Sequence, residues 1–236
     1  MSAQFIGVGV GPGDPELLTL KAMRIIQQSD VVAYLSNHNG ESQALEIAHL
    51  ALENCNAAHL PIAMPMKNDR TEANAVYDQA AQSILGFIQQ GKSVAFLCEG
   101  DPLFYGSFSY LLERLSEENI STQVIPGITS FSAASAELQT PLSMLTESVA
   151  ILNGRHSQSR LIQALEQHNS LVIMKAGPYR PKIIQALSQS KRLQDARYLE
   201  YVGREQQKVV DDVSMLADSK GPYFSLFIVT ASQRPD

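Results

Sequence analysis

The sequence is short of positive charge. Its 236 residues hold 18 Lys and Arg against 24 Asp and Glu, so the net charge is −6 and the isoelectric point is near 5.4. No run of Lys and Arg forms a basic patch, so the composition offers little attraction for a nucleic acid or an anionic membrane surface. We therefore expect no nucleic-acid partner.

Cysteine is scarce and no apolar stretch is long. The two cysteines, Cys55 and Cys98, are far apart and lack a CxxC spacing, which argues against a disulfide framework or a zinc site. No window reaches the length of a membrane span, and the N-terminus lacks the basic and apolar segments of a signal peptide. These absences predict a cytoplasmic protein without a membrane partner.

The sequence also lacks the motifs of hydrolases and metalloenzymes. There is no G-x-S-x-G or H-E-x-x-H pattern, and the five histidines show no metal-ligand spacing. We therefore expect no metal site in the protein. With 44% hydrophobic residues the chain can still bury a sizeable core, so we expect a folded globular protein.

What the chain does contain is an alternation of short β-branched runs and amphipathic helical patterns. The strand-like runs are residues 5–10, 31–34, 94–97, 124–125, 149–152, 171–174 and 224–230. Helices are predicted from Glu16 and from Ser42, and such alternation is typical of an α/β fold. Because Pro126 and Gly127 precede a helix rich in small residues, we predict two α/β domains, residues 1–120 and 121–236.

The run from Gly7 to Pro15, GVGVGPGDP, has the glycine content of a nucleotide-binding loop. It does not fit a dinucleotide fingerprint, because Pro12 and Asp14 stand where the third glycine belongs, and it lacks the Lys-Ser/Thr pair of a phosphate loop. Asp14 and Pro15 instead suit the cap and first position of a helix. Since glycines permit positive φ and the close approach of a ligand, a ligand-binding role for this loop remains an alternative to the capping interpretation.

Three further loops follow predicted strands. Residues 98–107 repeat the Gly-Asp-Pro tripeptide, with an acid and two aromatic residues at the edge where open α/β sheets bind ligands. A capped helix is the alternative. Residues 126–130 offer hydroxyls and N–H groups at a helix start. Residues 174–177 contain small side chains against which an adenine ring can lie, although a plain strand exit explains them too.

Together these loops resemble the tetrapyrrole methyltransferase family, and the likeness covers nearly the whole chain. The residues that carry it are 9–22, Met64-Pro65-Met66, Tyr77 with Ala80-Ala81, and 97–108. The first run is shared by the wider family. The run Cys-Glu-Gly-Asp-Pro with Tyr-Gly-Ser-Phe resembles the corresponding run in the enzymes of this family that methylate precorrin-2 or cobalt-factor II at C20.

The resemblance implies two α/β domains with the active site in the cleft between them, on a fold unrelated to the Rossmann methyltransferases, and a homodimer. It implies S-adenosylmethionine-dependent methyl transfer to the C20 meso carbon in cobalamin biosynthesis. Cofactor contacts carried over by motif position are Pro12, Glu99, Gly100, Asp101, Tyr105, Thr129, Ser130 and Ala176. No catalytic base is assigned. For Asp101, helix capping is an equal alternative to a donor contact.

A tetrapyrrole substrate carries many carboxylates, which an acidic protein must meet with local cations. The candidates in predicted loops are Lys67, Arg70, Arg155, Arg180, Lys182 and Arg204. A solvated surface charge is the alternative for each of them. The chain departs from the family pattern at Leu35-Ser36 and after Leu152, where the relatives usually have proline, and the resemblance implies that both positions border the substrate.

Other functions remain as alternatives. One is a methyltransferase of the same family acting at another ring position. Two from different classes are a nicotinamide-dependent oxidoreductase, disfavoured by the failed fingerprint, and a non-catalytic ligand-binding protein. The sequence does not report whether the macrocycle contains cobalt, because that metal would belong to the substrate.

Overall fold

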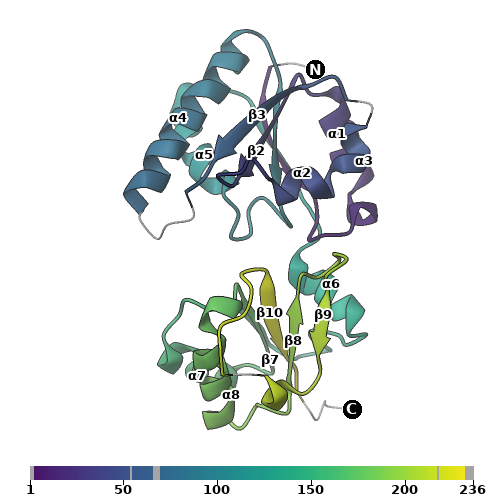
Figure 1. The fold of residues 1–236 in the computed structure, drawn as a ribbon, viewed down its shortest axis with the longest axis vertical. Coiled ribbons are helices and arrows are strands. Elements are labelled where there is room, and N and C mark those ends of the chain that lie inside the picture. The colour runs from purple at the N-terminus through teal and green to yellow at the C-terminus, as the bar shows by residue number, and fades with distance from the viewer. Residues whose placement is uncertain (1–2, 54, 66–69, 217, 232–236) are drawn as a thin grey trace. The chain divides into compact units, whose positions relative to one another are not determined.

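The computed structural model describes residues 3–53, 55–65, 70–216 and 218–231. The chain divides into two compact units, Met1–Thr129 and Ser130–Asp236 (Figure 1). Strands and helices alternate in both units, which confirms the α/β fold that the sequence predicts.

The first unit is a parallel sheet with helices on both faces. Its strands run in the order β3-β2-β4-β1-β5 and are β1 (Phe5–Gly9), β2 (Val31–Ser36), β3 (Ala58–Ala63), β4 (Val94–Cys98) and β5 (Thr122–Ile125). Its α-helices are α1 (Leu20–Gln28), α2 (Gln43–Ile47), α3 (His49–Leu52), α4 (Arg70–Gln89) and α5 (Phe108–Leu115), with 3-10 turns η1 (Pro15–Leu17) and η2 (Ser116–Glu118). Every strand pair is parallel, so all five carboxyl ends share one edge.

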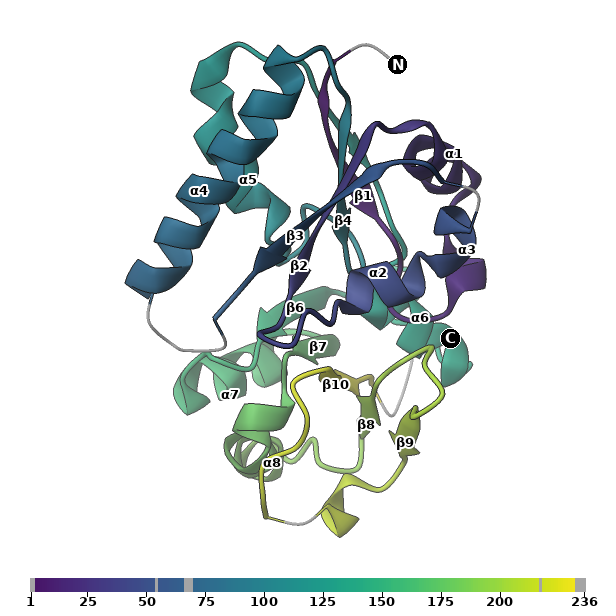
Figure 2. The ribbon, with the colours of Figure 1, turned by 45° about the horizontal axis from the view of Figure 1, so that its top comes forward.

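Two apolar cores lie on the two faces of this sheet, because successive strand residues point to opposite sides. Phe5 and Phe96 belong to the core that includes Leu111 of α5, whereas Ile6 packs in the other core with Ile26 of α1. Figure 2 shows α4 and α5 on one face and α1, α2 and α3 on the other. Burial on both faces explains why these strands read as continuous apolar runs.

The second unit is built on a mixed sheet in the order β6-β7-β10-β8-β9. Its strands are β6 (Val149–Asn153), β7 (Ser170–Met174), β8 (Ala196–Glu200), β9 (Lys208–Val210) and β10 (Ser225–Val229). Its helices are α6 (Ser130–Glu137), α7 (Gln158–Gln167) and α8 (Arg180–Gln189), with 3-10 turns η3 (Gly177–Tyr179) and η4 (Val213–Met215). Because β10 is antiparallel to both β7 and β8, their carboxyl ends flank the start of β10.

The structure differs from the sequence-based expectation at three places. The first α-helix begins at Leu20, capped by Thr19 Oγ1, and not at Glu16, because residues 15–17 form a separate 3-10 turn. The predicted domain boundary at residue 120 would put strand β5 in the second domain, but β5 pairs with β1 in the first unit. This pairing is a long-range contact that the local signal at Pro126 does not indicate. Strands β8 and β9 were not predicted, because their charged residues break the apolar pattern.

Candidate active site

Three loops meet at the carboxyl edge of the first sheet. Strand β1 lies between β4 and β5 and is parallel to both, so the segments after Gly9, Cys98 and Ile125 leave the sheet side by side. The carboxyl ends of parallel strands are where open α/β sheets bind ligands. The structure therefore brings together the three loops of this unit that the sequence singles out.

The first two loops are joined through their backbones. Gly11 N–H donates to Gly100 O at 3.3 Å, and Gly100 N–H donates to Gly11 O at 2.7 Å. Gly11 has φ +84° and Gly100 has φ +67°, which is the left-handed region where glycine has no steric cost. The glycine content at this edge thus serves a close backbone junction between β1 and β4.

The third loop is in contact with the same junction. A Cβ placed on Gly9 would lie 2.5 Å from Gly127 N and 2.7 Å from Gly100 O, closer than real side chains approach. Gly7 is also required by packing, because a Cβ there would lie 2.6 Å from the buried ring of Phe108. The glycines of β1 therefore let a neighbouring loop and a core ring approach the strand directly.

Asp101 connects the second loop to the third. Its Oδ1 accepts the N–H of Leu103 at 2.9 Å, and its Oδ2 accepts the N–H of Gly127 at 3.1 Å. Hydrogen bonds to an ionised carboxylate are about twice as strong as neutral ones. Both carboxylate oxygens thus hold main chain in place. Asp101 caps a turn and not the helix start that the sequence analysis expected, and its link to Gly127 was missed there.

The two Gly-Asp-Pro tripeptides have different local structures. Asp14 Oδ1 accepts the N–H of Glu16 at 2.8 Å and caps η1, with Pro15 in its first turn, as the sequence predicts. After Asp101 the chain forms turns instead, and α5 begins only at Phe108. The expectation that the second copy opens a helix was therefore wrong.

The turn before α5 is conformationally strained at Tyr105. Tyr105 has φ 53°, a left-handed conformation that is uncommon for a non-glycine residue, and its side chain is 44% exposed. Phe104 lies against it, with the ring centroids 5.1 Å apart in an edge-on arrangement. Such outliers persist where the surrounding structure fixes them and are frequent at binding sites. An exposed aromatic ring therefore stands beside the junction.

A further aromatic residue supports the end of this turn. Tyr77 of α4 is buried, its hydroxyl donates to Ser107 Oγ at 3.0 Å, and its ring stacks on Tyr110 at 5.1 Å. Tyr77 carried part of the family resemblance, but its link to the loop spans 30 residues and no local pattern predicts it. Its role in the structure is to position the residues that precede α5.

Four further predicted cofactor residues lie in these three loops or, for Ser130, directly after the third of them, where the second unit begins. Pro12 is buried within the first loop, Glu99 is half-buried at the end of β4, and Thr129 is half-buried just before α6. Ser130 is the first residue of α6. Beside them, burial raises the pKa of the Cys98 thiol far above its usual range. Cys98 is therefore a core residue and not a nucleophile.

Ala176 and four of the predicted cations lie in the second unit. Ala176 is fully buried, and its N–H donates to Ser225 O at 3.0 Å. Arg180 is 7% exposed, donates to Ser219 O at 2.8 Å and lies 3.6 Å from the carboxylate of Glu200. Lys182 Nζ donates to Gly154 O at 2.8 Å, and desolvation lowers its pKa. Arg155 is exposed in the turn after β6.

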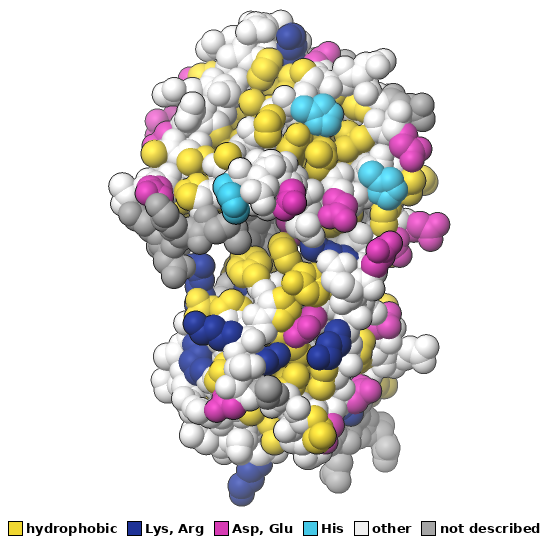
Figure 3. Space-filling view, in the orientation of Figure 1, with side chains coloured by type: hydrophobic (Ala, Val, Ile, Leu, Met, Phe, Trp, Pro, Cys, Tyr) yellow, Lys and Arg dark blue, Asp and Glu magenta, His cyan; other side chains and the backbone are white. Residues whose placement is uncertain are grey.

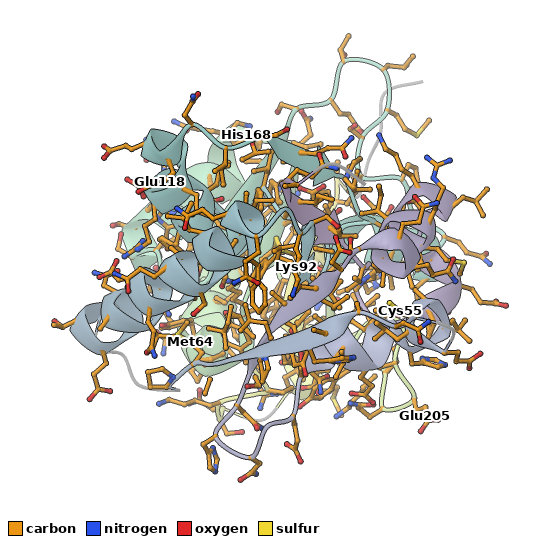
Figure 4. All side chains as sticks on the ribbon, turned by 90° about the horizontal axis from the view of Figure 1, so that it is seen from above. Cys55, Met64, Lys92, Glu118, His168 and Glu205 are labelled. Atoms are coloured by element: carbon orange, nitrogen blue, oxygen red, sulfur yellow. The ribbon has the colours of Figure 1, made fainter. Side chains whose placement is uncertain are left out.

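The other predicted cations are Lys67, Arg70 and Arg204. Lys67 lies outside the described residues, and Arg70 is the first residue of α4, with its side chain likewise outside the description. Arg204 lies after β8, with its guanidinium carbon 4.3 Å from the centre of the Phe224 ring. Met64, from the resemblance motif, follows β3, and Cys55 precedes that strand (Figure 4). A substrate role for the six cations stays a prediction.

Comparison with known proteins decides the family. The model of the tetrapyrrole (corrin/porphyrin) methylases matches residues 4–216. The chain belongs to the tetrapyrrole methylase family. It is 36% identical to a precorrin-2 C(20)-methyltransferase of Sinorhizobium sp. over 96% of this chain and 94% of that protein. It is 30% identical to a cobalt-precorrin-2 C(20)-methyltransferase of Salmonella typhimurium, over 97% of each chain.

A solved methylase structure has the same fold. The uroporphyrin-III C-methyltransferase of Thermus thermophilus, crystallised with S-adenosylhomocysteine, superposes with a TM-score of 0.69 at 21% identity and covers 96% of this chain and 97% of its own. This likeness confirms the tetrapyrrole methylase fold. Membership of a methylase family also sets aside the oxidoreductase and the non-catalytic binding protein as alternatives.

Within the described residues, no group of three His, Cys, Asp or Glu side chains is placed to hold a metal ion. In the same part of the chain, no helix has the length and apolarity needed to cross a membrane.

Proposed function

We propose that this chain transfers a methyl group from S-adenosylmethionine to C20 of precorrin-2, or of its cobalt-containing counterpart, in cobalamin biosynthesis. The observation that carries the proposal is its near full-length similarity to two relatives named for methylation at that carbon, at 36% and 30% identity. The relatives differ in whether their named substrate contains cobalt, so the proposal covers both forms.

The residues at the edge of the first sheet fit a methyl donor of this kind. S-adenosylmethionine carries positive charge on its sulfonium and its amino group, and Asp14, Glu99 and Asp101 give this edge a negative charge. These carboxylates would repel a nucleoside triphosphate, and no phosphate-binding Lys follows the glycines to offset the repulsion. The charge of the loops thus favours a cationic nucleoside over a polyanionic one.

We assign the donor contacts to the residues carried over from the family motif. They are Pro12, Glu99, Gly100, Asp101, Tyr105, Thr129, Ser130 and Ala176. Tyr105 offers an exposed ring for stacking, and Thr129 and Ser130 offer hydroxyls to a ribose or a carboxylate. Ala176 is fully buried, backbone included, so a contact from it to the donor requires a local movement of the chain.

The chain's contribution to the reaction is positional. The bound donor supplies a methyl group that is already activated by its sulfonium, so a strong acid is not needed. Displacing reacting groups by about 1 Å can cost about a hundredfold in rate. The Gly11–Gly100 pairing and the two hydrogen bonds of Asp101 fix the three loops against such displacement. No residue is assigned as the base that removes the proton from the methylated carbon.

We assign the substrate carboxylates to the predicted cations and the functional unit to a homodimer in the cytoplasm. Candidate interface residues are the most exposed large apolar side chains: Leu20 is 88% exposed, Leu145 81% and Met215 80%. Light scattering after gel filtration tests the dimer. A mass near twice 25.8 kDa supports it, and a monomer mass contradicts it.

The proposed function is tested by methyl transfer under anaerobic conditions. S-adenosylmethionine with a labelled methyl group is offered with precorrin-2 and, separately, with cobalt-factor II. Incorporation of label into either macrocycle supports the proposal and identifies the metal state of the substrate. Tight binding of S-adenosylhomocysteine without transfer to either would contradict it.

A further inference from the structure

The turn between β4 and α5, residues 101–107, is closely packed and carries backbone strain. A Cβ placed on Gly106 would lie 2.6 Å from Pro102 O, so the turn folds back on its own main chain. Tyr105 within it has the left-handed φ of 53°. Such a conformation persists only where the surrounding structure fixes it. The carboxylate of Asp101 holds the beginning of the turn, and a different contact holds its end.

The end of the turn is held through Ser107. Ser107 is the N-cap residue of α5, but within the described part of the chain its hydroxyl does not cap that helix. Serine is favoured at this position because its side-chain oxygen accepts an N–H of the first helical turn. Here Ser107 Oγ accepts the hydroxyl of Tyr77, from α4, at 3.0 Å. A local hydrogen bond is thus replaced by one that ties the turn to a neighbouring helix.

The Tyr77 ring is held by side chains of both helices. Tyr77 is 7% exposed, its ring stacks on Tyr110 at 5.1 Å, and the guanidinium carbon of Arg114 lies 5.6 Å from its centre. Arg114 Nε donates to Asp78 Oδ1 at 2.6 Å, and Arg114 also donates to Tyr110 O at 2.9 Å. Figure 3 shows that most of the Lys and Arg side chains in view lie on the second unit, so Arg114 belongs to the unit with fewer cations. These contacts fix the direction of the Tyr77 hydroxyl.

The turn that Tyr77 holds also carries two of the proposed donor contacts. Asp101 begins it, and Tyr105, which is 44% exposed, lies two residues before Ser107. Two residues span at most about 7 Å, so a displacement at Ser107 reaches Tyr105 directly. A contact residue that is not already ordered must be ordered when the ligand binds, which lowers affinity. The hydrogen bond at Ser107 therefore bears on donor binding.

We infer that Tyr77 is a positioning residue for methyl transfer, whose hydroxyl acts through Ser107 to hold the turn that presents Asp101 and Tyr105 to the methyl donor. The inference rests on the proposed function. Because the hydrogen bond is made within the folded chain, the turn is ordered before the donor arrives, and donor binding does not bear that cost.

The test uses Tyr77→Phe, Ser107→Ala and the double variant. Phenylalanine keeps the stacked ring and removes only the hydroxyl. The Kd of S-adenosylhomocysteine, measured by calorimetry, should rise about three- to tenfold in each single variant, as the loss of one hydrogen bond allows. The double variant should lose no more than either single variant, because both changes remove the same contact. A purely structural role would lower Tm and leave this Kd unchanged.

Tyr110→Phe is the matched control, because it removes the same group from the ring that stacks on Tyr77. It leaves the link from Tyr77 to Ser107 intact and should bind S-adenosylhomocysteine as the wild type does. Wild-type Kd in both single variants, additive losses in the double variant, an equal loss in the control, or no binding by the wild type would each overturn the inference. Failure of the proposed function is distinct, since it is read as absent methyl transfer by the wild-type enzyme.

Discussion

Substitution of Gly9 by alanine tests the three-loop junction most sharply. The added Cβ would lie 2.5 Å from Gly127 N, 2.6 Å from Gly127 Cα and 2.7 Å from Gly100 O. Ordinary van der Waals contact begins at 3.4 Å, so the backbone of the third loop must withdraw by about 0.9 Å. No flexible side chain can move aside, because all three neighbours are main-chain atoms.

The expected cost of Gly9→Ala follows from this displacement. Overpacking a close contact costs about 1–3 kcal/mol. In a protein of this size that lowers Tm by about 2–12 °C. A shift of nearly 1 Å in the loops should also lower kcat/KM for methyl transfer by up to about a hundredfold.

Gly86→Ala is the matched control, because Gly86 lies within α4 and a Cβ there has open space within 4 Å. Replacing a helical glycine by alanine should stabilise the protein by about 0.5–1 kcal/mol and raise Tm. Differential scanning calorimetry of both variants measures the two opposite shifts. A Gly9→Ala protein with wild-type Tm and activity would refute the close junction.

The structure makes three further predictions. Asp101→Asn leaves either Leu103 N–H or Gly127 N–H without its acceptor, so it should lower the free energy of unfolding by about 1–3 kcal/mol and lower Tm. An unchanged Tm would show that the carboxylate does not join the loops. Hydrogen bonds from the Ser93 N–H and hydroxyl lower the pKa of Asp30 in the folded protein. The stabilisation that these hydrogen bonds give the fold is therefore present above the unfolded pKa of 3.8 and is lost as pH falls through the lower folded pKa. The Tm deficit of Ser93→Ala should therefore shrink between about pH 6 and about pH 3, and a deficit that is constant with pH would contradict the coupling. Because Cys98 is buried and its pKa is raised, Cys55→Ser protein should react with a thiol reagent only after unfolding, whereas fast reaction of the native variant would refute the burial.

The fold is largely predictable from the sequence because the central strands are buried on both faces. Phe5 to Gly9 and Val94 to Cys98 are fully buried runs, and such runs between helical patterns indicate a parallel sheet. Strand β8 was missed because Arg197 and Glu200 flank the two buried residues Tyr198 and Leu199 and so leave too short an apolar run to indicate a strand.

The candidate site is predictable in its loops and not in its contacts. The glycines and prolines mark the turns after β1, β4 and β5, which is local information. The link from Asp101 to Gly127 and that from Tyr77 to Ser107 join residues far apart in the chain, so they depend on the folded sheet.

The position of the transferred methyl group tests the central claim most directly. The purified protein is incubated anaerobically with S-adenosylmethionine carrying a ¹³C methyl group and with precorrin-2 or cobalt-factor II, and the product is examined by NMR. The account predicts that the new ¹³C methyl resonance is attached to C20. A methyl group on any other ring carbon, or no labelled product from either macrocycle, would contradict it.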